Sequence, residues 1–353
     1  MIRMEMKTEI LPAKGEGIAK AAALLRRGEL VALPTETVYG IAADARNGEA
    51  VAKIFVAKGR PQDNPLIVHI TGPEMLPGLV SEVPERAQLL MAAFCPGPIT
   101  LILHRSRLVP DRITGGLDTV GVRIPENDIA RAMIRAAGVP VAAPSANLSG
   151  RPSPTTAQAT ARDMDGRIPL ILDGGPCRFG VESTIVDCTG ERAVILRPGA
   201  VTREMLEELL GKGQVGLDPA LVGAKTVPKA PGMKYTHYAP KAPMTLIEGE
   251  PSRMGQAFAR EIQRLRAEGR RVGVVASREV LQELGGLIPA ELAADYGHQG
   301  DLPAIAANLY EALRSFDDKP ADVLLGEGTA GTGLGLAIMN RLHKASGFRT
   351  IHA

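Results

Sequence analysis

The sequence predicts an α/β protein with an open sheet over residues 1–210 and a smaller Rossmann-like α/β unit over residues 243–353. Short apolar runs of strand character alternate with longer runs whose apolar residues recur at helical spacing. Polar side chains follow the strand-like runs repeatedly, as they do at ligand sites on the edges of open α/β sheets. Apolar periodicity fades over residues 211–242, which we therefore predict to be a linker.

The elements of the first region follow from its apolar pattern. Apolar runs predict strands at 8–13, 30–33, 66–70, 99–103, 119–124, 139–143, 168–172, 184–187 and 193–196. Helical spacing predicts helices at 15–27, 48–58, 84–94, 127–137, 155–164 and 202–210. Gly28 ends the first helix, and Gly59 with Pro61 ends the second.

The second region carries a glycine-rich turn. Strands are predicted at 244–247, 271–276 and 322–325, and helices at 251–268, 278–284, 303–316 and 335–345. Residues 326–331, Gly-Glu-Gly-Thr-Ala-Gly, formally match the dinucleotide-binding pattern, which also requires an acidic residue about 20 positions later. No Asp or Glu follows Glu327. We therefore predict a Rossmann-like unit whose turn need not bind a nucleotide.

Composition limits the classes of function. Hydrophobic residues make up 45% and charged residues 23%, which is ordinary for a soluble globular protein. The net charge of +2 does not indicate a nucleic-acid binder. The three cysteines lack CxxC spacing, which favours reduced thiols in the cytoplasm and argues against a zinc site. Neither a signal peptide nor an apolar run of about 18 residues is found, so we predict no contact with a membrane.

Cations gather between a predicted helix and the strand after it. Lys58 and Arg60 lie in this loop and suit a polyanion, although basic residues also complement helix ends. Arg123 lies inside an apolar strand and needs a partner, either a structural carboxylate or a bound anion. His69 ends a strand, where a lone histidine is more often a packed core residue.

Two further strands lead into a proline and then small polar residues, in the sequences PTETVYG (34–40) and PSANLSG (144–150). Plain turns would explain both segments equally well. The phosphate-binding pattern GxxxxGK[ST] is absent, which excludes a P-loop enzyme. The range 211–242 contains tyrosines and a histidine that a passive spacer would lack, so we expect it to dock as a lid.

Eight segments together resemble the long form of the threonylcarbamoyl-AMP synthase family. In order they are PTETVYG, KGRPxxNPLIVHI, GVRIP, APSANLSG, GVESTIVD, LRPG, PGMKYTHYAP and GLGLAIMNRL. The resemblance implies a YrdC-like domain, which is an open twisted mixed sheet with helices, plus a Rossmann-like C-terminal domain. The chain departs from the family pattern at Cys95, Ala230 and Thr236.

The resemblance implies a nucleotidyltransferase. Its substrates would be L-threonine, bicarbonate or CO2, and ATP with Mg2+, and its products L-threonylcarbamoyl-AMP and pyrophosphate. The product would pass to the machinery that modifies the adenosine beside the anticodon of certain tRNAs. Weak RNA binding is left open.

The same resemblance assigns the site residues. It makes Lys58 and Arg60 catalytic. The implied ATP-binding residues are Arg60, Asn64, Thr119, Ser145, Asn147, Ser153, Arg197, Tyr235, Thr236 and His237. The implied L-threonine-binding residues are Thr35, Thr37, Lys58, His69, Arg123, Ala143 and Ser183. No residue is assigned to a protein-held metal.

Two other functions remain as alternatives. A double-stranded RNA-binding module would need a surface rich in Lys and Arg, which a net charge of +2 makes secondary. An enzyme that acts on another acceptor, as hydrogenase-maturation proteins do, would carry zinc-finger and acylphosphatase-like domains. This chain has neither the CxxC motifs nor the length for them.

Overall fold

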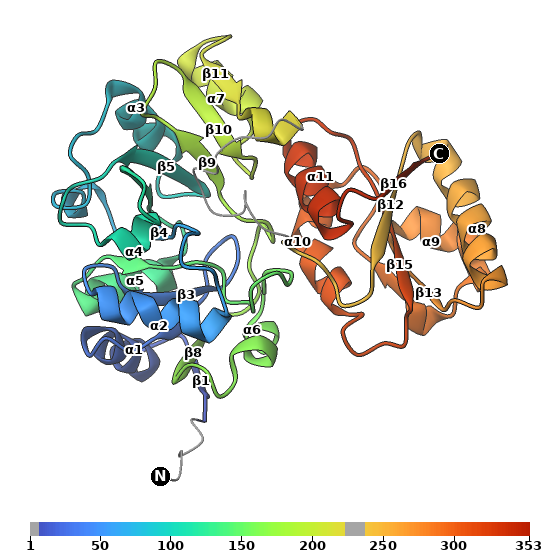
Figure 1. Ribbon diagram of the computed structural model, residues 1–353, viewed down its shortest axis with the longest axis horizontal. Coiled ribbons are helices and arrows are strands. Elements are labelled where there is room, and N and C mark those ends of the chain that lie inside the picture. The colour runs from blue at the N-terminus through green and yellow to red at the C-terminus, as the bar shows by residue number, and fades with distance from the viewer. Residues whose placement is uncertain (1–6, 223–236) are drawn as a thin grey trace. The chain divides into compact units, whose positions relative to one another are not determined.

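The computed structural model describes residues 7–222 and 237–353, and these divide into two compact units (Figure 1). The first unit comprises residues 7–149, 153–178 and 182–222. The second comprises residues 150–152, 179–181 and 237–353. Each unit has its own sheet and its own hydrophobic core.

Eleven described strands form the sheet of the first unit. From one edge to the other they are β1 (Glu9–Pro12), β8 (Leu170–Asp173), β2 (Val31–Leu33), β3 (Gly40–Asp44), β7 (Val141–Ala142), β4 (Ile67–His69), β6 (Thr119–Arg123), β5 (Ile99–His104), β9 (Thr184–Asp187), β10 (Ala193–Arg197) and β11 (Val215–Leu217). Some neighbours are parallel, such as β4 and β6, and others antiparallel, such as β5 and β6. The predicted mixed sheet is confirmed.

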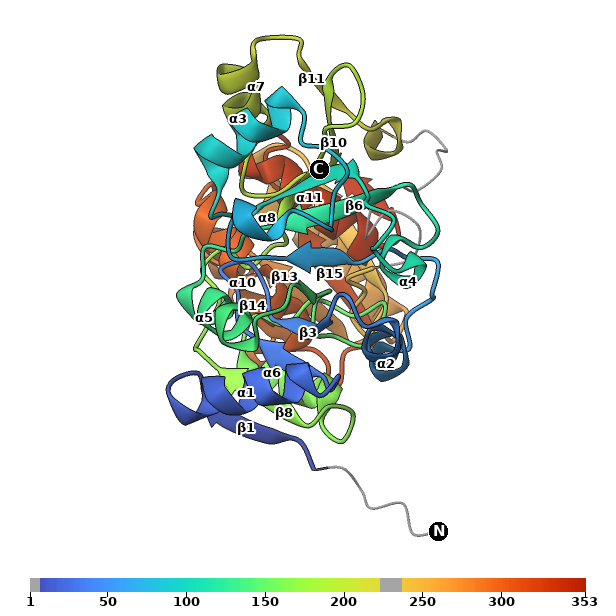
Figure 2. The ribbon, with the colours of Figure 1, turned by 90° about the vertical axis from the view of Figure 1, so that its left-hand side faces the viewer.

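Helices cover this sheet. They are α1 (Glu16–Arg26), α2 (Gly48–Lys58), α3 (Glu85–Phe94), α4 (Asp111–Thr114), α5 (Asp128–Ala137), α6 (Ala157–Met164) and α7 (Arg203–Leu210). Figure 2 shows α1 and β1 at one end of the sheet and α7 and β11 at the other. The side chain of Asn47 caps the start of α2, and Gly59 ends the helix in the left-handed conformation at φ 61°. Both ends of α2 are therefore fixed, and with them the position of Lys58.

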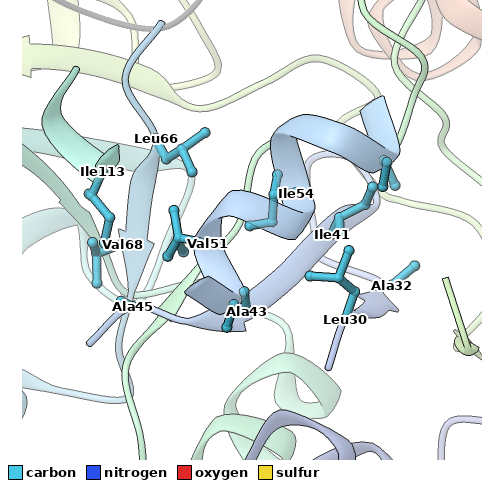
Figure 3. Packing of buried hydrophobic residues seen from close by; sticks show 14 of the residues in the cluster. Leu30, Ala32, Ile41, Ala43, Ala45, Val51, Ile54, Leu66, Val68 and Ile113 are labelled. Atoms are coloured by element: carbon cyan, nitrogen blue, oxygen red, sulfur yellow. The ribbon is translucent and has the colours of Figure 1, made fainter. Parts of the chain in front are cut away.

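The packing of strand β2 explains why the predicted strands are apolar at consecutive positions rather than at every second one. Ala32 belongs to the same buried cluster as Val51 and Ile54 of α2, on one face of the sheet (Figure 3). Val31 and Leu33 belong to a separate cluster that includes residues of α1 and α5. Because both faces are buried, both alternating sets of side chains must be apolar.

The second unit is a five-stranded parallel sheet among the described residues. Its order is β14 (Ala293–Asp295), β13 (Val272–Ala276), β15 (Val323–Glu327), β12 (Met244–Glu248) and β16 (Thr350–His352). Its helices are α8 (Pro251–Ala267), α9 (Arg278–Leu284), α10 (Leu302–Arg314) and α11 (Leu334–Ala345). α8 packs beside α9, and α10 beside α11, on opposite sides of the sheet (Figure 1). The Rossmann-like prediction is confirmed.

Four strands were not predicted. β3 has the sequence Gly-Ile-Ala-Ala-Asp, which is rich in small residues and lacks strand propensity. β11, β14 and β16 have three residues each and lie at sheet edges, so their apolar pattern is too short to recognise. β11 pairs with β10, so the first sheet extends beyond residue 210 into the range 211–242.

None of the helices in the described ranges combines the length and hydrophobicity that crossing a membrane requires.

Candidate active site

Lys58 joins two of the predicted motifs. It is the last residue of α2, and its side chain is buried, with 2% exposed. Its ammonium group donates to the main-chain oxygens of Ser145 (2.5 Å) and Asn147 (2.6 Å). A buried ammonium group is costly unless its hydrogens are accepted, so these contacts fix both Lys58 and the loop that it reaches. Lys58 therefore does more than complement the end of its own helix.

The loop that Lys58 reaches is also held by its own side chains. Ser145 Oγ donates to Asn147 Oδ1 (2.5 Å), and Asn147 Nδ2 donates to Leu148 O (2.7 Å). A β-bridge pairs Ser145 with Gly40, at the end of the PTETVYG segment. The sheet thus brings the two proline-led segments side by side.

Arg60 and Asn64 shape the loop after α2. Arg60 donates from Nε to Asn64 O (3.3 Å) and from Nη2 to Pro65 O (2.8 Å). The side chain of Asn64 is 2% exposed, and its Nδ2 has no hydrogen-bond partner within the described residues. Because a buried amide donor is rarely left unpaired, this nitrogen is suited to donate to a ligand. Thr119 begins β6, whose register with β4 places it at the same end of the sheet as this loop.

The threonines of PTETVYG are buried and brace their own turn. Thr35 Oγ1 donates to Val38 O (2.6 Å) and lies 2.9 Å from Thr37 Oγ1. It also accepts from the backbone N–H groups of Thr37 and Val38. Both hydroxyls are therefore used locally, which agrees with the simpler interpretation of this segment as a turn.

Arg123 has a carboxylate partner that the sequence did not reveal. Its Nη2 lies 2.8 Å from Glu36 Oε1, and each side chain is 5% exposed. The Nε–H of Arg123 finds no acceptor within the described ranges. Burial alone would raise the pKa of Glu36, but the charge and hydrogen bond of Arg123 outweigh it and lower that pKa. The Arg123 guanidinium thus favours the carboxylate form of Glu36, and its Nε–H is a donor suited to a second anion.

His69 lies beside Arg123, because the register of β4 and β6 pairs the two residues. Burial, together with the charge of Arg123, lowers the pKa of His69 to about 3, although Glu36 acts in the opposite direction. Its Nδ1 lies 3.3 Å from Ile67 O, which also accepts from the backbone of Ala143 at 3.0 Å. His69 is therefore a neutral imidazole within the core.

We expect this burial to make stability depend on pH. An unfolded chain protonates histidine near its ordinary pKa of about 6.5, so below that pH the unfolded state binds the extra proton. The free energy of unfolding should then fall, by up to about 1.4 kcal/mol per pH unit, with Glu36 adding to the loss at lower pH. Urea unfolding between pH 7 and pH 5 measures the slope. His69→Gln should flatten it, and His104→Gln, an exposed control in the same unit, should keep it; equal slopes would contradict the prediction.

Ser183 is enclosed by partners. Its Oγ lies 2.8 Å from Thr100 Oγ1 and accepts from Arg197 Nη2 at 3.2 Å. Arg197 also donates from Nε to Ser183 O at 3.1 Å. Elsewhere in this unit Ser153 Oγ donates to Glu182 Oε1 at 2.6 Å. The contacts between Ser183 and Arg197 hold the start of β9 and the end of β10 together.

The predicted residues thus fall into small connected groups. Lys58 is joined to the 145–147 loop, His69 to Arg123, and Ser183 to Arg197. His237 belongs to the second unit, where its ring lies 5.6 Å from that of Tyr238. Tyr235 and Thr236 lie outside the described residues.

Three buried polar partners were missed. Glu36 and Glu182 lie inside PTETVYG and GVESTIVD, so those motifs contained the signal. Thr100 lies in an apolar strand with no distinguishing pattern. Within residues 7–222 and 237–353, no three His, Cys, Asp or Glu side chains are grouped as metal ligands.

Comparison with known proteins finds relatives along nearly the whole chain. Residues 23–199 match a family model described as "Telomere recombination", and residues 201–347 match one described as "Threonylcarbamoyl-AMP synthase, C-terminal domain". The threonylcarbamoyl-AMP synthase of Bacillus subtilis is 48% identical over 98% of this chain and 97% of its own length. That of Pyrococcus abyssi is 47% identical over 94% of each chain.

The fold agrees. The crystal structure of P. abyssi Sua5 complexed with L-threonine is similar to this chain, with a TM-score of 0.91 and 46% identity. The similarity covers 98% of this chain and 100% of that one. Sequence and structure agree along nearly the entire length, and the chain belongs to the threonylcarbamoyl-AMP synthase family.

Proposed function

We propose that this protein is an L-threonylcarbamoyladenylate synthase, a nucleotidyltransferase that uses L-threonine, bicarbonate or CO2, and ATP. The observation that carries the proposal is the contact of the Lys58 ammonium group with the main chain of Ser145 and Asn147. This contact joins the loop after α2 and the 144–150 segment into one site. The names of the relatives support the proposal, and the bound L-threonine of the P. abyssi structure supports the choice of amino acid.

The reaction needs positioning and charge neutralisation more than covalent chemistry by the protein. The threonine amine forms an N–C bond to CO2 and loses a proton, giving a carbamate. A carbamate oxygen then forms a bond to the α-phosphorus of ATP, and the bond to the β-phosphate oxygen breaks to release pyrophosphate. Two negatively charged groups must approach each other, so nearby cations are the main requirement.

The described side chains suit these steps. Lys58, Arg60 and Arg197 are proposed to neutralise phosphates, and Asn64 to donate a hydrogen bond to the nucleotide. Arg123 is proposed to bind the threonine carboxylate through the donors that Glu36 leaves available. The remaining ATP contacts are assigned to Thr119, Ser145, Asn147, Ser153, Tyr235, Thr236 and His237. The remaining threonine contacts are assigned to Thr35, Thr37, His69, Ala143 and Ser183.

Mg2+ is proposed to arrive with ATP. The ion usually binds through substrate phosphates and few carboxylates. Within the described residues no cluster of carboxylates is present, and the proposed site offers hydroxyl and amide oxygens, which fits an ion held mainly by the phosphates. Bound there, the ion would offset phosphate charge.

Other parts of the account stay predictions. These are transfer of the product to the tRNA-modifying machinery, a cytoplasmic location, weak RNA binding, and the division into 1–210, a lid at 211–242, and 243–353. Much of the predicted lid lies outside the described residues. The double-stranded RNA-binding alternative is not favoured, because the relatives are named as synthases.

We expect pyrophosphate release to require both threonine and bicarbonate. The carbamate must form before any group can attack the α-phosphorus, so omission of either substrate should reduce release to background. A coupled pyrophosphate assay in buffer depleted of CO2 measures this. D-threonine serves as the matched control and should be inactive. Release of phosphate with formation of ADP would contradict the proposal.

A further inference from the structure

The second unit contains a cavity of about 490 Å³ that the proposed reaction does not use. Its lining residues come from three segments, 249–254, 296–305 and 327–330, which follow strands β12, β14 and β15. Because these strands are parallel members of one sheet, the cavity opens at their carboxyl ends. Its volume falls in the range of about 300–1,000 Å³ that is usual for small-molecule sites.

The topology explains why a cavity forms there. β12 and β15 are neighbours, but α8 after β12 and α11 after β15 pack on opposite sides of the sheet (Figure 1). Connections that leave adjacent strands in opposite directions open a crevice between them, and ligands of open α/β sheets bind in such crevices.

Glu327 supplies the central polar group. Its side chain is 2% exposed, its Oε2 accepts from Ser277 N (2.6 Å), and its Oε1 accepts from Gln299 Nε2 (3.0 Å). A carboxylate can accept about four hydrogen bonds, so about two positions remain. The Tyr296 hydroxyl donates to Glu327 O at 3.3 Å, and burial raises the pKa of Tyr296 well above its ordinary value. The Tyr296 proton is thus used by the main chain, and the side-chain oxygens of Glu327 are the acceptors at the cavity.

The charges exclude a phosphate. Glu250 also lines the cavity, whereas no Lys, Arg or His does so within the described residues. Two glycines near the cavity, Gly328 of the turn and Gly335 of α11, are explained by packing. A Cβ on Gly328 would lie 2.9 Å from Glu248 Cγ, and one on Gly335 would lie 1.8 Å from Ala330 O. Packing against the protein therefore accounts for Gly328 and Gly335.

We propose that this cavity binds an uncharged nucleoside. Its ribose diol would donate to Glu327, as acidic residues of dinucleotide-binding sheets accept from ribose hydroxyls. Its base would lie against the apolar side chains of Met254, Leu302 and Ile305, which line the same cavity. This proposal does not rest on the proposed synthase reaction.

Met254 gives a readout specific to this cavity in the full-length protein. Methionine methyl groups are labelled with carbon-13, the Met254 resonance is assigned with Met254→Leu, and adenosine is titrated. We expect a saturable shift of this resonance that persists in Lys58→Ala, where the proposed ATP site is altered. Glu327→Gln should weaken binding about ten- to hundredfold, the usual effect of losing a hydrogen bond to a charged group.

Further variants and ligands keep the proposal testable. Ala330→Phe at the exposed rim should block the shift without touching the buried carboxylate. AMP and 2′,3′-dideoxyadenosine should each bind at least about tenfold more weakly than adenosine, through charge repulsion and loss of donors respectively. The proposal is overturned if adenosine leaves Met254 unshifted, if AMP binds as tightly as adenosine, or if the shift survives both Glu327→Gln and Ala330→Phe.

Discussion

Lys58→Ala is expected to lower turnover at least about 100-fold, because loss of a preorganised charge at a transition state typically costs about 2.7–4 kcal/mol. The buried contacts of Lys58 add a second effect. Two main-chain oxygens would lose their donor, at about 1–3 kcal/mol of folding stability for each group left unsatisfied. Steady-state pyrophosphate release and a melting curve on the same sample measure the two effects separately.

Lys53→Ala is the matched control. Lys53 lies on the same helix, and its exposed ammonium group pairs with Glu29. We expect nearly normal turnover, with at most about 1 kcal/mol lost from stability. If Lys58→Ala retained full activity while losing only stability, Lys58 would be a structural residue alone.

Glu36→Gln is expected to destabilise the fold by about 3–5 kcal/mol, because it leaves the charge of Arg123 buried without its partner. In our account Glu36 also orients Arg123 toward the threonine carboxylate. The KM for threonine should therefore rise more than kcat falls, while the KM for ATP changes little. Chemical denaturation and kinetics at saturating ATP measure these effects.

Glu29→Gln is the matched control, because it removes an ion pair of the same separation. The Glu29–Lys53 pair is also 2.8 Å apart, but its side chains are 41% and 44% exposed. An exposed pair contributes only about 0–1 kcal/mol, so this variant should behave like the parent. A Glu36→Gln protein that lost stability but kept its KM for threonine would show that the buried pair has no part in substrate binding.

The fold could be predicted largely from local pattern. The apolar runs of β2 and β5 and the capped helix α2 carry their signals within a few residues. β3 failed because alanine and glycine give weak strand signals, although its backbone pairs with both β2 and β7. Whether such a segment forms a strand depends on its pairing with other strands, and that pairing cannot be recognised in the sequence of the segment itself.

The candidate site, like the fold, could be predicted only in part from local sequence patterns. Lys58 and Ser145 stood out because each lies in a motif, but their contact is a consequence of tertiary packing. Arg123 required a partner on physical grounds, yet the sequence left a carboxylate and a bound anion equally open. The structure supplies Glu36, a residue whose motif was recognised but whose role was not. Such a role depends on how deeply the side chain is buried and on which way it points, and both are properties of the folded chain.

The most direct test of the central proposal is mass spectrometry of the nucleotide product formed from ATP, L-threonine and carbon-13 bicarbonate. Our account predicts threonylcarbamoyl-AMP that carries one labelled carbon, with pyrophosphate released in equal amount. AMP without the labelled group, or ADP with phosphate, would contradict it.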